Sequence, residues 1–351
     1  MNVFDQDNND VTKIENSHLF VTNSLAGGGA ERATNTLVNE LNSRGIYVVL
    51  APLNIGIPDK VIVECPILEA SRTWESGLFN TFRALKLFQD QVRVLKPKTV
   101  ILNCDLPELF GALTFGRFQL IVVEHASKPW PTRKHLGKIV RMILKLRKAK
   151  WVAVSNHLTI WNIDEIAPMV IPNAIPNLKE NYDLIRYPNS VERLVYIGRL
   201  SEEKDPFFFL DLVKVTGLKG VIFGDGHLRQ NLGDFVSSNN LTVEFIGFTS
   251  QLWDLIFKSD LIVMTSLNEG DGLVFLEAIN VGIPIVLRDI PDLRRFGLEP
   301  KFYFKTPEDF SDHVLPLIDS YSISNIIRER ILRPREPATV ASYWEKLLSN
   351  H

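Results

Sequence analysis

Two cationic side chains follow a short apolar run in the second half of the chain. The segment YIGRLSEEKDP places Arg199 where the apolar run closes and Lys204 five residues later. Arginine presents a planar fork of donors and lysine a compact point charge, so the pair suits a diphosphate. Each such charge-assisted hydrogen bond contributes on the order of 1.5–3 kcal/mol. The alternative interpretation is that both are solvated loop charges.

Two carboxylates lie eight residues apart in the segment SLNEGDGLVFLEAINVGIPIV. Glu269 follows an apolar run, and Glu277 belongs to a helix that we expect to begin near Gly272, with Leu273 and Val274 contributing its first amides. Free amides at a helix N-terminus attract phosphate, and a carboxylate accepts hydrogen bonds from adjacent hydroxyls. We therefore expect Glu269 to hold sugar hydroxyls and Glu277 a ribose. Alternatively, Glu277 only favours the helix dipole.

A glycine-rich turn follows the first apolar run of the chain. In NSLAGGGAERATNTL, Gly28 and Gly29 lead into a helix that we expect to open at Ala30 and Glu31. The dinucleotide fingerprint G-x-G-x-x-G is incomplete because Arg32 replaces its third glycine, which argues against a nicotinamide-dependent dehydrogenase. The turn suits a phosphate, although a tight turn without a ligand is the alternative.

A histidine stands at the end of another apolar run, QLIVVEH. At the carboxyl end of a strand, His125 can accept a proton or hydrogen-bond a sugar hydroxyl near neutral pH. Its neighbour Glu124 points to the opposite face of the same strand. A single histidine of this kind is often a bystander, and that interpretation stays open.

The elements that position these residues follow a βαβα rhythm, which predicts parallel sheets covered by helices on both faces. The strands expected in the first half are residues 18–23, 46–52, 98–103, 119–125, 151–155 and 169–173. Those of the second half are residues 193–199, 219–226, 241–248, 260–266 and 282–289. Ligands of open α/β sheets bind at the carboxyl ends of strands, where all the residues above lie.

A polar, proline-punctuated stretch separates the two series of strands. We predict an N-terminal domain over residues 1–174, a linker over 175–192, a C-terminal domain over 193–335 and a final amphipathic helix over 336–351. The predicted fold class is α/β, with two Rossmann-like, doubly wound parallel-sheet domains facing a cleft.

Length and composition exclude several classes of protein. At 351 residues the chain exceeds the usual size of one hydrophobic core. Its 39 Lys and Arg nearly balance 41 Asp and Glu, so we expect no nucleic-acid partner. The cysteines Cys65 and Cys104 have neither metal-ligand spacing nor a disulfide framework. With a polar N-terminus and no run of about 18 apolar residues, a cytoplasmic location is expected.

Taken in order, GGGAER, His125, GRLSEEK, GDGHLR and the E-x7-E spacing of Glu269 and Glu277 resemble the retaining GT-B glycosyltransferases. This superfamily includes bacterial mannosyltransferases and glycogen and sucrose synthases. The resemblance runs from about residue 18 to residue 290, and only the E-x7-E segment is specific by itself. It implies the GT-B fold, with the C-terminal helix returning to the first domain.

The resemblance also implies roles in a phosphate pocket. Arg199 and Lys204 would bind the donor diphosphate, and Gly28 and Gly29 would approach it from the first domain.

The resemblance also implies which residues contact the donor sugar and the ribose. Glu269 would contact the sugar, the amides of Gly272 to Val274 the sugar and phosphate, and Glu277 the ribose. His125 would reach the reaction centre. Asp271 departs from the pattern, since relatives commonly carry an aromatic or small residue there. A negative charge beside a diphosphate is normally unfavourable.

The implied reaction moves a sugar from a nucleotide-diphosphate sugar to an acceptor hydroxyl with retention of configuration. UDP is the commoner nucleotide, and the implied setting is bacterial surface-polysaccharide synthesis with a glycan or lipid-linked acceptor. We expect no cofactor and no essential metal, because the only early D-x-D, Asp5 and Asp7, lies in the polar tail. The alternatives are a UDP-sugar epimerase of similar shape and a noncatalytic nucleotide-sugar-binding subunit.

Residues Arg133 to Lys150, RKHLGKIVRMILKLRKAK, contain eight Lys or Arg and no acidic residue. Such a basic amphipathic helix can rest on anionic lipid, which would place the protein at the inner face of the membrane. An ordinary helix with an apolar side on the core and a solvated basic face is the equal alternative.

Overall fold

The computed structural model describes residues 17–25, 28–55, 63–68, 72–73, 77–126, 129–161, 163, 166–176, 178, 191–249, 251–257, 259–320 and 323–349. Asp5, Asp7 and most of the expected linker lie outside these residues. The chain divides into two compact units, of which unit 1 holds residues 1–174 with 335–351 and unit 2 holds residues 175–334. Each unit is described by itself below.

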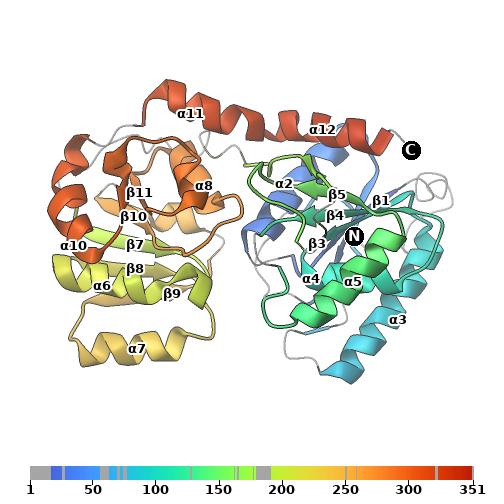
Figure 1. Cartoon of the computed structure of the whole chain (residues 1–351), viewed down its shortest axis with the longest axis horizontal. Helices are drawn as coiled ribbons and strands as arrows, with labels where there is room; N and C mark the ends of the chain where they lie inside the picture. The colour runs from blue at the N-terminus through green and yellow to red at the C-terminus, as the bar shows by residue number, and fades with distance from the viewer. Residues whose placement is uncertain are drawn as a thin grey trace. The chain divides into compact units, whose positions relative to one another are not determined.

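Unit 1 is built on a six-stranded parallel sheet with the strand order β2-β1-β3-β4-β5-β6. Figure 1 labels β1, β3, β4 and β5 of this sheet. The strands are β1 (His18–Thr22), β2 (Val48–Pro52), β3 (Thr99–Asn103), β4 (Gln119–Glu124), β5 (Lys150–Ala153) and β6 (Met169–Val170). All six were expected from their apolar runs. Because β2 lies on one side of β1 and β3 on the other, the direction of winding reverses between β1 and β3.

Helices cover both faces of this sheet, because side chains alternate across a strand. Leu19 and Val21 of β1 pack with α3 (Leu78–Leu95), α4 (Asp105–Leu113) and α5 (Lys134–Leu146). Phe20 between them packs on the other face with α2 (Gly29–Ser43) and α12 (Pro337–Ser349). The ring centroids of Phe20 and Trp344 are 5.6 Å apart, so the C-terminal helix is part of the core of unit 1.

Unit 2 is built on a second six-stranded parallel sheet, with the strand order β12-β11-β10-β7-β8-β9. Its strands are β7 (Arg193–Ile197), β8 (Lys219–Phe223), β9 (Val243–Gly247), β10 (Asp260–Met264), β11 (Ile285–Arg288) and β12 (Tyr303–Phe304). The apolar runs predicted all of these except β12, which is only two residues long. The two sheets with their flanking helices confirm the predicted α/β class.

The order of strands in unit 2 is that of the doubly wound dinucleotide-binding fold. The chain runs from β7 outward to β8 and β9, and then returns to place β10 on the other side of β7. Right-handed crossovers therefore put α6 (Pro206–Thr216) and α7 (Arg229–Ser238) on one face and α8 (Leu273–Val281) on the other. The remaining helices include α9 (Pro291–Arg294), α10 (Pro307–Asp309) and α11 (Asn325–Leu332).

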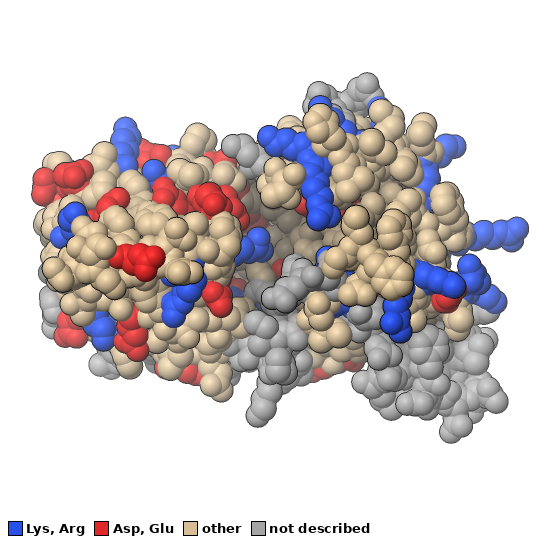
Figure 2. Space-filling view, turned by 90° about the horizontal axis from the view of Figure 1, so that it is seen from below, with Lys and Arg blue, Asp and Glu red and all other residues tan. Residues whose placement is uncertain are grey.

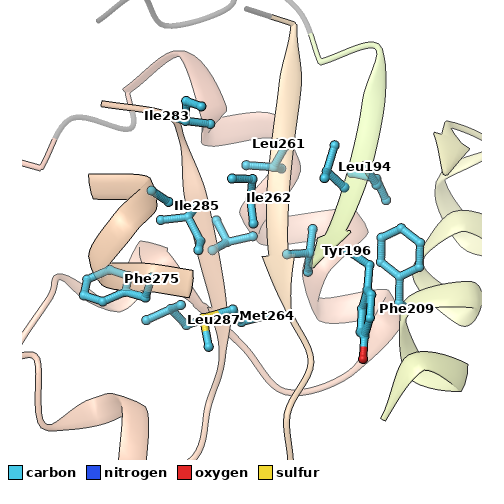
Figure 3. Packing of buried hydrophobic residues seen from close by; sticks show 14 of the residues in the cluster. Leu194, Tyr196, Phe209, Leu261, Ile262, Met264, Phe275, Ile283, Ile285 and Leu287 are labelled. Atoms are coloured by element: carbon cyan, nitrogen blue, oxygen red, sulfur yellow. The ribbon is translucent and has the colours of Figure 1, made fainter. Parts of the chain in front are cut away.

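The core of unit 2 joins the central strands to the helices on both faces. Figure 3 shows Leu194, Leu261 and Ile285 from adjacent strands in this cluster, with Tyr196 beside Phe209 of α6. The Tyr196 hydroxyl donates a hydrogen bond of 2.8 Å to the carbonyl oxygen of Arg199. The core thus holds the backbone that leaves β7.

Helix α5 corrects the expectation that the charges of Arg133 to Lys150 are all solvated. Arg141 is fully buried, and its guanidinium binds Glu108 at 2.7 Å and Glu124 at 2.6 Å. Burial raises the pKa of Glu124 to about 7, although the charge of Arg141 opposes this shift. Removing one partner of such a buried pair costs about 3–5 kcal/mol, so Arg141 is a structural residue of unit 1.

Candidate functional site

The winding of unit 2 reverses between β7 and β10, which lie side by side in parallel register. The loops that follow these two strands are therefore neighbours, although they are far apart in the sequence. The Lys204 ammonium nitrogen lies 2.6 Å from Oε1 of Glu269. The structure thus brings together the cation predicted for the diphosphate and the carboxylate predicted for the sugar.

Glu269 is buried and held from several directions. Its Oε1 accepts a hydrogen bond of 2.7 Å from the Ser266 hydroxyl in addition to the contact with Lys204. Its backbone N–H donates to Oδ2 of Asp292 at 2.8 Å. These contacts come from the loops after β7 and β10 and from α9, and they hold both the carboxylate and the backbone of Glu269.

Lys204 ends a single 3-10 turn, Glu202–Lys204, and the chain then turns sharply into α6. Asp205 adopts a left-handed conformation with φ of 44° and caps α6 by accepting from the N–H of Phe208. The Thr265 hydroxyl lies 2.9 Å from the Lys204 carbonyl oxygen and 3.0 Å from that of Asp205. The loop that carries the lysine is therefore tied to the end of β10.

Arg288, at the end of β11, also holds the loop that carries Lys204. Its guanidinium donates to Oδ2 of Asp205 at 2.6 Å and to the Thr265 carbonyl oxygen at 3.0 Å. It also lies over the Phe208 ring, 4.1 Å from the centroid. Three parallel strand ends, those of β7, β10 and β11, thus position Lys204.

Arg199 is placed differently from Lys204. Its side chain is 64% exposed, and its guanidinium lies 3.9 Å from the Glu203 carboxylate. Its backbone is nevertheless fixed, because a Cβ at Gly224 would stand 2.0 Å from the Gly198 carbonyl oxygen, and φ at Gly224 is +130°. Only glycine permits this approach of the loop after β8. The Arg199 guanidinium therefore lies at the surface, while the backbone before it packs closely against the loop after β8.

Helix α8 begins where the sequence predicted it. Gly272 is its N-cap with φ of +67°, and a Cβ there would lie 3.3 Å from the Phe296 ring. The N–H of Leu276 donates to the Gly272 carbonyl oxygen, so the amides of Leu273 and Val274 precede the first bond of the helix. Glu277 is buried in the same helix. The N-terminus of α8 follows Glu269 by one short loop.

Asp271, the departure in this loop, is paired with an arginine. Its Oδ1 lies 3.3 Å from the Arg295 guanidinium, and the carboxylate is buried. Its charge is therefore partly compensated within unit 2.

In unit 1 the glycine-rich turn forms the start of α2. Gly28 is the N-cap, and its carbonyl oxygen accepts from the N–H of Arg32. The helix begins at Gly29, one residue before the expected Ala30. Both glycines therefore lie at a helix N-terminus, at the carboxyl end of β1, where an anion is favoured.

His125 follows β4 of unit 1, and its side chain is half-buried. Nε2 lies 2.9 Å from Oδ1 of Asn103, and Nδ1 is buried with no hydrogen-bond partner among the described residues. The side chain borders a cavity of about 20 Å³ together with Asn103, Asn173 and Trp344. Burial lowers the pKa of His125 to about 4, so the ring is neutral at pH 7.

Several residues that position the predicted site residues were not predicted from the sequence. Thr265, Arg288, Asp292 and Arg295 each contact Glu269, Asp271 or the Lys204 loop through contacts between loops distant in sequence. One local signal existed, because Asp205 followed by Pro206 is typical of an N-cap with proline at the first helical position. The other contacts have no local signature.

The family model described as Glycosyl transferases group 1 matches residues 186–330. A relative from Campylobacter jejuni is 32% identical over 278 residues, which cover 74% of this chain and 76% of the relative. That protein is GalNAc-alpha-(1->4)-GalNAc-alpha-(1->3)-diNAcBac-PP-undecaprenol alpha-1,4-N-acetyl-D-galactosaminyltransferase. A second relative, alpha-D-kanosaminyltransferase of Streptomyces kanamyceticus, is 27% identical, and the match spans 47% of this chain and 44% of that protein.

Among solved structures, HepE of Anabaena in complex with UDP and glucose is similar with a TM-score of 0.75. The match covers 95% of this chain and 99% of HepE at 17% sequence identity. At this identity the likeness shows the fold, which is GT-B as predicted.

A substitution at Thr265 tests whether its hydroxyl holds the loop that carries Lys204. Replacing Thr265 by valine keeps the side-chain volume but removes the hydroxyl that binds the Lys204 and Asp205 carbonyl oxygens. We expect local opening of this loop to become easier by about 1 kcal/mol, the net contribution of one hydrogen bond. Hydrogen exchange of the Leu267 amide, which donates to the Glu203 carbonyl oxygen, reports this opening.

Thr265→Ser is the matched control, because it keeps the hydroxyl and loses only a methyl group. Its Leu267 amide should stay as protected as in the wild type. Equal protection in the valine variant would show that the hydroxyl does not hold the loop.

Proposed function

The chain belongs to the glycosyl transferases group 1 family, and we propose that it transfers a sugar from a nucleotide-diphosphate sugar to an acceptor hydroxyl. The observation that carries the proposal is the contact of 2.6 Å between Lys204 and Glu269 at the switch point of unit 2. The expected nucleotide is UDP, and the expected stereochemical outcome is retention.

The proposed donor site places positive groups where the leaving phosphate develops charge. Lys204 supplies a fixed ammonium group, and Arg199 a guanidinium on a long, exposed side chain. The first amides of α8, those of Leu273 and Val274, add donors that need no reorganisation. As the bond from the anomeric carbon to the phosphate oxygen breaks, these groups stabilise the departing diphosphate. The leaving phosphate oxygen receives the proton of the acceptor hydroxyl.

The carboxylates are proposed to bind hydroxyl groups of the donor. Glu269 is held by Ser266 and by the Asp292 carboxylate, so it can accept from sugar hydroxyls without losing its position. Glu277 is proposed for the ribose. Gly28 and Gly29 at the start of α2 are proposed to approach the diphosphate.

His125 is proposed to stand beside the donor sugar as a neutral group. Its low pKa makes it a weak base at pH 7, and its Nε2 is engaged by Asn103. We therefore assign no proton transfer to its ring. The donor phosphate takes that role instead.

The acceptor is proposed to be a glycan on a lipid carrier in the synthesis of a bacterial surface polysaccharide. Support comes from the name of the Campylobacter jejuni relative, which describes an undecaprenol-linked substrate for that protein.

No helix among the described residues is long and apolar enough to cross a membrane.

Helix α5 supports a proposal that the protein binds the inner membrane face peripherally. Its outer side exposes Ile139, Met142 and Leu146 together with the exposed lysines Lys134 and Lys138. Figure 2 shows several Lys and Arg side chains projecting from unit 1, at the right, on the face turned to the viewer. Apolar side chains next to basic ones suit the boundary between acyl chains and anionic headgroups.

Lys204→Ala tests the proposed chemistry. Loss of the ammonium group should reduce transfer at least a hundredfold, because one preorganised charge at a leaving phosphate contributes about 3 kcal/mol. The measurement is acceptor-dependent release of free nucleotide, with glycosylated product followed by mass spectrometry. Lys204 is half-buried, and without it Glu269 still keeps its hydrogen bonds with Ser266 and Asp292, so thermal unfolding should show that the variant keeps the fold.

The matched control is Lys219→Ala, which removes a lysine that pairs with Glu244 on the exposed edge of the sheet. It should transfer at the wild-type rate. Wild-type turnover that isomerises the nucleotide sugar without an acceptor would instead show an epimerase, and full activity of Lys204→Ala would remove the lysine from the mechanism.

Co-sedimentation with vesicles tests the membrane proposal. With vesicles containing anionic phosphatidylglycerol, the wild type should sediment, and Lys134→Glu with Lys138→Glu should reduce binding by roughly 1 kcal/mol or more for each lysine. A variant with the same change in net charge, Lys219→Glu with Lys214→Glu in unit 2, should sediment like the wild type. Failure of the wild type to sediment with anionic vesicles would refute membrane binding.

A further inference from the structure

Asp271 lies directly before Gly272, the N-cap of α8, whose first amides belong to the proposed donor site. Its carboxylate is buried in the loop between Glu269 and this helix. An uncompensated negative charge here would repel a diphosphate, since unit charges interact over several ångströms in a partly buried site. The arrangement therefore needs a cation that offsets Asp271.

Arg295, which follows α9, is that cation. Its guanidinium Nη2 lies 3.3 Å from Oδ1 of Asp271 and 3.3 Å from the Gly270 carbonyl oxygen. Its Nε donates to the Asp292 carbonyl oxygen at 2.7 Å, and the guanidinium lies over the Phe296 ring at 4.6 Å. These contacts orient the guanidinium toward the loop.

The same contacts connect Arg295 to the position of Glu269. Asp292 connects the two residues: its carbonyl oxygen accepts from Arg295, and its carboxylate accepts from the N–H of Glu269. Arg295 thus holds both ends of the loop, at Gly270 and Asp271 directly and at Glu269 through Asp292. The loop, the N-terminus of α8 and α9 form one connected structure.

We propose that the Asp271–Arg295 pair sets the charge of the donor site, with Arg295 as a positioning residue that cancels the repulsion of Asp271 toward the diphosphate. This inference rests on the proposed function, because it assumes that a nucleoside diphosphate binds beside α8. It predicts a fixed order of affinities for a nucleoside diphosphate among the wild type and its charge variants. Removal of the Asp271 charge alone strengthens anion binding because one negative charge near the site is lost, whereas removal of the Arg295 charge alone weakens it.

The test is calorimetric titration of UDP into the wild type, Asp271→Asn, Arg295→Met and the double variant. Asp271→Asn should bind UDP about three- to tenfold more tightly, the effect of one unit charge at roughly 8 Å in a partly exposed site. Arg295→Met should bind more weakly by at least the same factor. In the double variant, Asp271→Asn should recover much of the affinity that Arg295→Met loses.

The sign of the Asp271→Asn effect separates this proposal from a purely structural role. If the pair only holds the loop, breaking it from either side weakens UDP binding, and the second substitution recovers nothing. Raising the ionic strength from 0.05 to about 0.5 M should shrink the differences among variants, because salt screens charges. Thermal unfolding of each variant checks that the fold is kept.

The outcomes also separate this inference from the proposed function. If the wild type binds UDP and Asp271→Asn binds it equally or more weakly, the inference alone is overturned. If the wild type binds neither UDP, GDP nor ADP, the proposed donor site fails, and the inference fails with it.

Discussion

The candidate site depends on the parallel pairing of β7 with β10. The direction in which strands are added to the sheet of unit 2 reverses between these two strands. The loop after β7 carries Lys204 and the loop after β10 carries Glu269, so the pairing brings the two residues together. No local propensity brings these residues together, because 65 positions separate them in the sequence. The apolar strands bury their side chains on both faces, and the reversal brings the two loops together at their carboxyl ends, where ligands of this fold class bind.

Charge balance is the second constraint on this region. Lys204 faces Glu269, Arg288 faces Asp205, and Arg295 faces Asp271, so each of these three acids has a cation within 3.3 Å. A partly buried carboxylate without such a partner would be costly. The pairs hold these polar groups in place. A diphosphate arriving there meets oriented groups, which is the condition for electrostatic stabilisation of a leaving group.

Much of the fold could be predicted from the sequence because continuous apolar runs of four to seven residues are typical of strands in parallel sheets. The run RLVYI became β7 and DLIVM became β10 as expected, whereas the two-residue β12 gave no detectable pattern. The start of α8 at Leu273 was predictable from the glycine before it. The burial of Arg141 had no local signal in the sequence, because its partners, Glu108 and Glu124, come from α4 and β4.

The site residues could be predicted in type, but their supports could not. Arg199, Lys204, Glu269 and Glu277 stand just after strands or within a helix that follows one, and their motifs are recognisable in the sequence. Thr265, Arg288 and Arg295 support them only through tertiary contacts. The inward-facing ring of His125 likewise depends on Asn103, which a different strand supplies. Thermal unfolding with a panel of UDP-, GDP- and ADP-sugars is the direct test of a nucleotide-diphosphate site at the strand ends of unit 2. One nucleotide series should raise the melting temperature in a concentration-dependent manner. An unchanged melting temperature with every member of the panel would contradict it.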